Sequence, residues 1–109
     1  MWQSLRHAQL RMGHCPLNFH LSRIGVIGSS DCQCGHPTED VEHYLLECPL
    51  YIDLRNELQN VLLDLNVPMS VDVLLTGSDR LSYDNNKILF TSVHNYIRNS
   101  GRFATTTFS

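Results

Sequence analysis

The chain has 109 residues, 42% of them hydrophobic and 17% charged, which fits one folded domain and excludes a disordered chain. No apolar run approaches the roughly 20 residues of a membrane-spanning helix, and no secretory signal pattern is present, so we expect an intracellular protein with no membrane partner. The net charge is −3, but Arg6, Arg11 and Arg23 lie in an N-terminal third without acidic residues, and only this third could attract a polyanion.

Hydrophobic spacing and the positions of glycine and proline predict two helices in the N-terminal part of the chain. The first covers residues 3–12 and ends at Gly13. The second follows Pro16, a residue favoured in a first helical turn, and ends at Gly25. Residues 25–37 then form an irregular loop rich in Gly, Ser, Asp and Pro. The side chains expected to face the core are Leu5, Ala8, Met12, Leu17, Leu21 and Ile24.

Three longer helices and one short helical turn follow this loop. Thr38 is predicted to cap the third helix, and Pro49 ends it because a proline disfavours helical geometry in the residue before it. The fourth helix restarts after the proline and ends at Asn66, a short turn lies near 71–75, and the last helix covers 84–99. The side chains expected on their buried faces are Leu50, Leu54, Leu58, Leu62, Leu65, Leu89, Val93, Tyr96 and Ile97.

These segments predict a mainly α fold. We expect a single helical domain over residues 1–101, a metal loop over 31–49 and a frayed tail over 102–109. No strand is expected beyond a short extended piece in the metal loop.

Three of the four cysteines lie in one short segment together with a histidine. In a reducing compartment, clustered cysteines beside a histidine bind metal more often than they form disulfides. Zinc takes four sulfur or nitrogen donors in a tetrahedron, so we predict one Zn²⁺ bound by Cys32, Cys34, His43 and Cys48. A site closed by four protein ligands leaves no position for water, which predicts a structural rather than a catalytic metal.

Backbone geometry allows the four ligands to converge. In extended backbone the first two cysteines, two residues apart, point the same way. On an uninterrupted helix the histidine and the last cysteine would differ by about 140° around the axis, so the break at Pro49 is needed to bring them together. His36 competes with His43 as fourth ligand, and His43 is favoured because a helix fixes its direction. Glu39 and Glu47, one turn on either side of His43, are candidates to orient its second ring nitrogen.

The other reactive residues give weaker signals. Cys15 follows His14 directly, and adjacent side chains seldom face each other, so a semi-buried thiol is expected. His7, His20 and His94 are isolated in the sequence. No phosphate-binding glycine loop, nucleophile elbow or metalloprotease motif is present, so we expect neither an enzyme nor a small-molecule substrate.

A series of short motifs in order along the chain resembles one known family, the zinc-binding region at the C-terminal end of reverse transcriptase polyproteins from non-LTR retrotransposons. The resemblance runs from about Leu5 to Leu63. The motifs are Arg11-Met12-Gly13-His14, Leu17-Asn18, His20-Leu21, Arg23-Ile24-Gly25, Cys32-Gln33-Cys34-Gly35, Glu42-His43, Leu45-Leu46-Glu47-Cys48-Pro49, and Tyr51 with Arg55.

The resemblance implies that the matching cysteines and histidine, at positions 32, 34, 43 and 48, are zinc ligands. It gives Arg11, Gly13 and His14 a place in the pattern without a defined role. A full polyprotein of this kind is an RNA-directed DNA polymerase, but the paired aspartates of a polymerase, an endonuclease and an acidic ribonuclease H site are missing here. The resemblance therefore implies a terminal fragment without catalytic modules.

Two functions follow as hypotheses. In the first, a non-catalytic zinc module helps to hold RNA or DNA during reverse transcription, with Arg6, Arg11 and Arg23 contacting phosphates. In the second, a protein-interaction module docks onto the upstream polymerase or ribonuclease H modules, because residues 31–66 carry eight acidic residues against one arginine. A redox switch that uses Cys32 and Cys34 is a third alternative.

Overall fold

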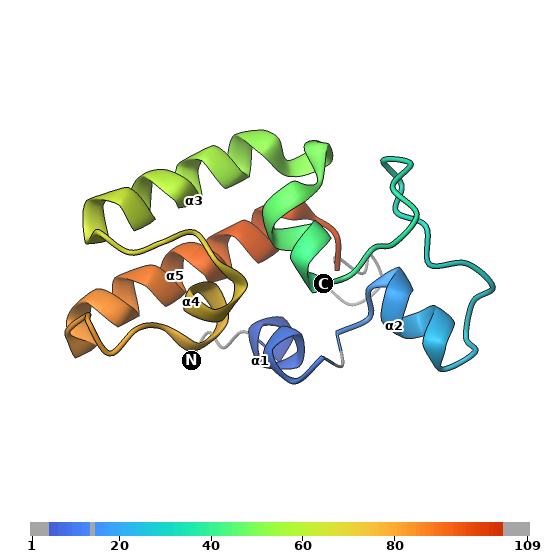
Figure 1. Ribbon diagram of the computed structural model, residues 1–109, viewed down its shortest axis with the longest axis horizontal. Helices are drawn as coiled ribbons and strands as arrows, with labels where there is room; N and C mark the ends of the chain where they lie inside the picture. Colours follow the sequence, from blue (N-terminus) through green and yellow to red (C-terminus); the bar gives the residue numbers. More distant parts are fainter. Residues whose placement is uncertain (1–4, 14, 104–109) are drawn as a thin grey trace.

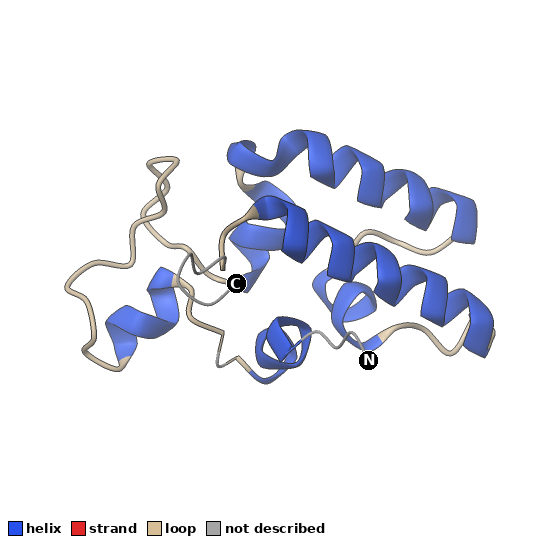
Figure 2. Cartoon of the chain, turned by 180° about the vertical axis from the view of Figure 1, so that it is seen from behind, coloured by secondary structure: helices blue, strands red, loops and turns tan. Residues whose placement is uncertain are grey.

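The structure, a computed structural model, describes residues 5–13 and 15–103. These residues form helices and loops without a strand, which confirms the predicted mainly α fold (Figures 1 and 2). No helix in this part of the chain is long and apolar enough to cross a membrane. The helices are α1 (Leu5–Met12), α2 (Asn18–Arg23), the π-helix η1 (His43–Glu47), the 3-10 helix η2 (Pro49–Tyr51), α3 (Ile52–Leu65), α4 (Val71–Thr76) and α5 (Tyr83–Ser100).

The two longest helices, α3 and α5, lie antiparallel and side by side, and α1 and α4 pack against α5 (Figure 1). Their contact surface is aliphatic, and each fully buried leucine or valine contributes about 1.5–3 kcal/mol by leaving water. The side chains at its centre are Leu58, Leu62, Leu74, Leu75, Leu89 and Val93. Sequence spacing predicted four of these residues as core.

Local capping fixes the ends of these helices. Asn66 ends α3 in the left-handed conformation with φ 61°, and Gly101 ends α5 with φ 67°. The hydroxyls of Ser70 and Ser82 accept the backbone N–H groups of Val73 and Asn85 and so begin α4 and α5.

Helix α1 turns a different face to the core from the one that apolar spacing predicted. Leu5 and Met12 are 63% and 62% exposed, whereas His7 and Leu10 are buried. The His7 Nε2–H donates to the carbonyl of Leu74 at 3.0 Å, so a polar side chain on the buried face has a partner. The prediction for α1 was wrong because hydropathy alone treats a hydrogen-bonded histidine as an outward residue.

Two apolar side chains elsewhere also differ from their predicted burial. Ile24 is 58% exposed at the end of α2, and Leu50 is 52% exposed in η2. Leu50 belongs to the 3-10 turn that precedes α3, so it does not continue the buried stripe of that helix.

The C-terminal segment begins with two packed residues, where a frayed tail from position 102 was expected. Arg102 donates from Nη2 and Nε to the two carboxylate oxygens of Glu39 at 2.6 and 2.7 Å. The Phe103 ring packs edge-to-face on Tyr44, with centroids 5.4 Å apart. Glu39 is 3% exposed, so this fork supplies the countercharge that a buried carboxylate needs. Residues 104–109 lie outside the described residues.

Candidate metal centre

The first two cysteines lie in a tight turn, on the loop that extends away from the helical bundle (Figure 1). The N–H of Cys32 donates to the carbonyl of His36 at 2.8 Å, and the N–H of Gly35 donates back to Cys32 at 3.0 Å. Gly35 has φ +100°, a conformation that side chains other than glycine rarely adopt. The expected extended piece is therefore a hydrogen-bonded turn, because the chain reverses within three residues of Cys32.

The second pair of predicted ligands is brought together by a π-helical turn. The N–H of Cys48 donates to the carbonyl of His43, five residues earlier, at 2.8 Å. This wider turn places the two residues above one another, whereas α-helical geometry would separate them by about 140°. Asp40, rather than the predicted Thr38, caps the helix, since its carboxylate accepts the N–H of His43 at 2.8 Å.

A π-turn leaves backbone carbonyls without their α-helical donors, and two side chains replace those donors. The N–H of Cys48 donates to the carbonyl of His43 and not to that of Tyr44. The carbonyl of Tyr44 therefore accepts the Tyr96 hydroxyl at 2.6 Å. The residue after Cys48 is a proline without an N–H, so the carbonyl of Leu45 accepts Arg55 Nε at 3.0 Å. Arg55 also donates from Nη2 to the carbonyl of Cys48 at 2.6 Å. Arg55 and Tyr96 thus hold the turn in its widened form.

The four predicted ligand atoms lie within 4.8 Å of one another. The sulfurs of Cys32 and Cys48 are 3.7 Å apart, and Cys34 Sγ is 3.3 Å from His43 Nε2. A tetrahedral zinc ion with bond lengths of about 2.3 Å to sulfur and 2.0–2.1 Å to nitrogen requires edges of about 3.8 and 3.6 Å. All four cysteines are free thiols. The cluster therefore has the dimensions of a metal site and could hold one ion.

The electrostatics of the cluster also suit a cation. Burial raises the pKa of Cys32 to about 12 and raises the pKa of Cys48, whereas the backbone N–H of His36 lowers the pKa of Cys34. Buried thiols in such surroundings stay neutral on their own. A divalent ion at their centre reverses this preference, because it stabilises the thiolates that coordinate it.

Two neighbours of His43 were predicted to orient it, and only one is near. Glu47 Oε1 lies 3.6 Å from Nδ1 of His43, which is buried and has no hydrogen-bond partner. Glu39 instead pairs with Arg102. A carboxylate near the second nitrogen of a ligating imidazole is the usual outer partner of a metal-bound histidine.

His36, the competing ligand, covers the histidine of the cluster from outside. The two rings stack with centroids 4.2 Å apart and planes inclined by 17°. Ring nitrogens coordinate in the plane of their ring, so stacking is an unfavourable arrangement for two imidazoles that share one ion, although ligand atoms of His36, His43 and Glu47 also lie within 4.8 Å of one another. His36 Nδ1 also faces the backbone of Thr38, at 2.9 Å from its carbonyl. This geometry favours His43 as the ligand.

The three predicted nucleic-acid residues have separate local surroundings in the structure. Arg6 donates to the side chain of Gln9 at 2.6 Å and lies over the Phe103 ring. Arg23 lies over Phe19 at 5.5 Å, and Arg11 is exposed near the end of α1. Of the Arg11, Gly13 and His14 segment, His14 lies outside the described residues.

Of the remaining reactive residues, Cys15 and His7 are buried, and His20 and His94 are partly buried. Cys15 is 2% exposed, and burial raises its pKa to about 12, as expected for an inert thiol. His94, which looked isolated in the sequence, lies with Nε2 3.0 Å from Nδ1 of His7. Burial lowers the pKa of both histidines, which favours neutral rings. Because neutral His7 donates to a carbonyl through Nε2, its Nδ1 accepts the hydrogen bond from His94.

Sequence comparisons point to one kind of mobile element. The chain is 50% identical over 44 residues to a retrovirus-related Pol polyprotein from the type-1 retrotransposable element R1 of Bradysia coprophila. The relatives that match it come from type-1 retrotransposable elements named R1 or R1DM. The resemblance predicted from the sequence is thereby confirmed. Two further relatives are a 115 kDa protein of the R1DM element of Drosophila melanogaster, 42% identical over 53 residues, and an R1 Pol polyprotein of Nasonia vitripennis, 43% identical over 44 residues.

These matches cover between 40% and 49% of the chain but only 4%, 5% and 11% of the three relatives. The chain thus spans only a small part of the length of each of these relatives. No protein-family model and no solved structure matches it.

Proposed function

We propose that Cys32, Cys34, His43 and Cys48 bind one structural zinc ion and that the chain acts as a non-catalytic zinc module of an R1-type polyprotein. The observation that carries this proposal is the convergence of four donor atoms within 4.8 Å from two separate segments. Three thiolates and one imidazole form a donor set that suits zinc, and four protein ligands leave no open coordination position.

The metal would join the extended loop to the helical bundle. Cys32 and Cys34 lie on the loop, and His43 and Cys48 belong to the turn that leads into α3. Because the loop has few apolar contacts of its own, ligation supplies a large part of its folding free energy. Zinc content of the purified chain tests this assignment: His43→Ala should lose the metal, whereas His36→Ala should keep it.

The module would assist RNA or DNA binding during reverse transcription. The support is the R1 relationship together with the three arginines of the N-terminal third, which could contact phosphates without reading sequence. The expected signature is binding to RNA or DNA that weakens as salt rises, with a slope that falls by about one for each arginine replaced by glutamine. Absence of binding at low salt would contradict this role.

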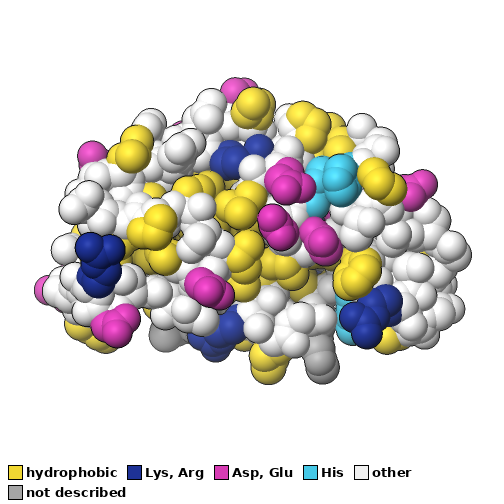
Figure 3. Space-filling view, viewed as in Figure 1, with side chains coloured by type: hydrophobic (Ala, Val, Ile, Leu, Met, Phe, Trp, Pro, Cys, Tyr) yellow, Lys and Arg dark blue, Asp and Glu magenta, His cyan; other side chains and the backbone are white. Residues whose placement is uncertain are grey.

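A specific surface favours the alternative function, a module that docks onto the upstream polymerase or ribonuclease H modules. Acidic side chains gather near the middle of one face, whereas basic side chains are dispersed (Figure 3). Glu47, in η1, and Glu42, directly before it, are exposed. Leu50 and Ile52, which follow shortly in the chain, are 52% and 54% exposed. Charge reversal of Arg6, Arg11 and Arg23 separates the functions, since it should abolish nucleic-acid binding and spare docking.

A further inference from the structure

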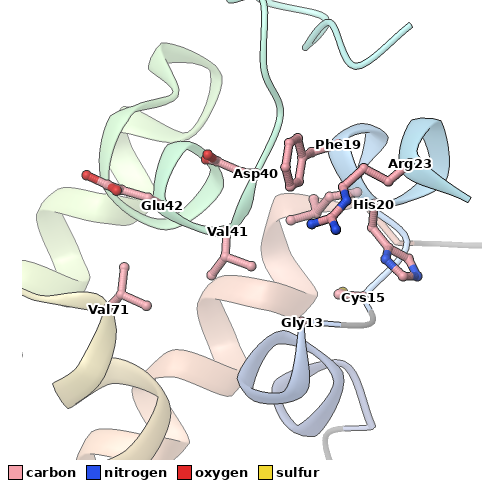
Figure 4. Close-up of a pocket in the computed structure, with 10 residues that line it drawn as sticks. Gly13, Cys15, Phe19, His20, Arg23, Asp40, Val41, Glu42 and Val71 are labelled. Atoms are coloured by element: carbon pink, nitrogen blue, oxygen red, sulfur yellow. The ribbon is translucent and has the colours of Figure 1, made fainter. Parts of the chain in front are cut away.

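A cavity of about 390 Å³ lies between α2 and the residues that lead into the metal-binding turn. Its interior is apolar, and Phe19, His20 and Arg23 lie together on the α2 side (Figure 4). Val41 and Val71 form the opposite side (Figure 4). A volume of this size is within the range of about 300–1,000 Å³ that is usual for small-ligand pockets.

We propose that this cavity receives one unstacked base of a single-stranded nucleic acid, which stacks on Phe19 while the adjoining phosphate pairs with Arg23. The inference rests on the nucleic-acid role proposed above and gives it a location. Any of the bases could occupy the cavity, whatever the sequence of the strand.

Phe19 has the properties of a stacking platform. Its side chain is 37% exposed although it borders a cavity, and the guanidinium of Arg23 lies over the ring at 5.5 Å from the centroid. A base that entered the cavity would place its flat face on this ring, and any base can do so because every base has a π face. Proteins commonly hold unstacked bases by stacking them on aromatic side chains or on the plane of an arginine guanidinium.

The basic groups of the cavity, Arg23 and His20, lie on its α2 side, whereas the two acidic residues of its lining, Asp40 and Glu42, lie on the opposite side (Figure 4). Every base carries a phosphate nearby, and Arg23 and His20 lie on the side where that phosphate would lie (Figure 4). An apolar protein side chain would use only the apolar interior, whereas a nucleotide would also place its phosphate against Arg23. On the opposite side Asp40 accepts the N–H of His43, and its carboxylate points away from Phe19 (Figure 4).

The metal loop holds the cavity in shape. The N–H of Phe19 donates to the carbonyl of Glu39 at 3.0 Å, and the N–H of Asn18 donates to the Glu39 carboxylate at 2.7 Å. Val41, on the far side of the cavity, lies two residues before His43. Release of the metal would loosen both sides, so binding of a base should require the metal-loaded chain.

The experiment compares two fluorescent strands of equal length, an oligothymidylate and a strand of the same number of abasic nucleotides. Binding of the full chain loaded with zinc is measured by anisotropy at several salt concentrations. Wild type should bind the thymidylate about 5- to 150-fold more tightly than the abasic strand, which is the usual contribution of one stacked base. Phe19→Ala should lose this difference and Phe19→Tyr should keep it. Leu63→Ala, an exposed apolar residue on α3, serves as the matched control.

The outcomes separate this inference from the function on which it rests. Equal wild-type affinity for the two strands, or a Phe19→Ala variant that keeps the preference, would overturn the base pocket while leaving arginine contacts to phosphate intact. If neither strand binds at low salt, the nucleic-acid role is overturned as well. Arg23→Gln should weaken both strands and reduce the salt slope by about one. Unchanged zinc content of each variant shows that it is folded.

Discussion

Replacement of Arg55 by methionine tests whether the widened turn prepares the metal site. Arg55→Met removes the donors of the Leu45 and Cys48 carbonyls, which lie at 3.0 and 2.6 Å, and keeps the aliphatic part of the side chain. A buried acceptor left unpaired costs about 1–3 kcal/mol. Because Arg55 is only half-buried, water can reach part of the vacated space, and we expect a total loss of about 2–4 kcal/mol in unfolding free energy.

The same substitution should weaken zinc binding. Without its outer donors the turn can revert towards α-helical geometry, which moves His43 and Cys48 apart. Loss of a residue that orients metal ligands typically weakens affinity by about 10- to 100-fold, and we expect this range. Competition with a chromophoric chelator measures the affinity, and denaturant unfolding of the zinc-loaded chain measures the stability.

Two further variants make the test specific. Arg55→Lys keeps the charge but has no planar fork, so it should fall between wild type and Arg55→Met. Arg80→Met, at an exposed position in the loop before α5, should change neither quantity. If Arg55→Met binds zinc as tightly as wild type, the turn does not depend on these donors and the reasoning is refuted.

Three other changes have predictable results. Arg102→Met leaves the buried Glu39 carboxylate without its countercharge and should lower the free energy of unfolding, measured in urea, by about 3 kcal/mol. Adding Glu39→Gln should restore part of this stability. If Arg102→Met is as stable as wild type, the packed C-terminal segment is contradicted. Burial and the nearby His7 lower the pKa of His94 to about 4 in the folded chain. Below pH 6.5 the unfolded chain therefore binds more protons at this residue than the folded chain does. The stability that His94 contributes above pH 6.5 is lost as the pH falls towards 4. Between pH 7 and 5 wild type should therefore lose about 1 kcal/mol more than His94→Asn, and equal losses would disprove a neutral pair. Gly77→Ala places a Cβ 2.6 Å from Asn86 Oδ1 at φ +78° and should lower the melting temperature, and an unchanged melting temperature would show that this loop relaxes freely.

The helices and the metal cluster were predictable because their signals are local. Helix α3 ends before Asn66, as predicted, and α5 ends one residue beyond its predicted end. Except for Leu50, the apolar side chains predicted for these two helices belong to the core or pack against it. The cysteines and the histidine identify a metal site by residue type alone, whatever the backbone between them does.

The contacts that shape the cluster could not be read from the sequence because they join distant segments. Tyr96 on α5 contacts the carbonyl of Tyr44, 52 residues earlier. Arg102 pairs with Glu39 across 63 residues, so a segment that looked unpartnered is packed. Pro49 was a usable signal, since a missing N–H requires another donor for the carbonyl four residues before it, but it does not identify Arg55 as that donor.

X-ray absorption at the metal edge of the purified chain tests the central claim most directly, because it reports the element and its ligand atoms together. We predict one zinc ion per chain with three sulfur ligands near ~2.3 Å and one nitrogen ligand at about 2.0–2.1 Å. A folded chain that contains no zinc, or zinc surrounded mainly by oxygen, would contradict the assignment of Cys32, Cys34, His43 and Cys48 as its ligands.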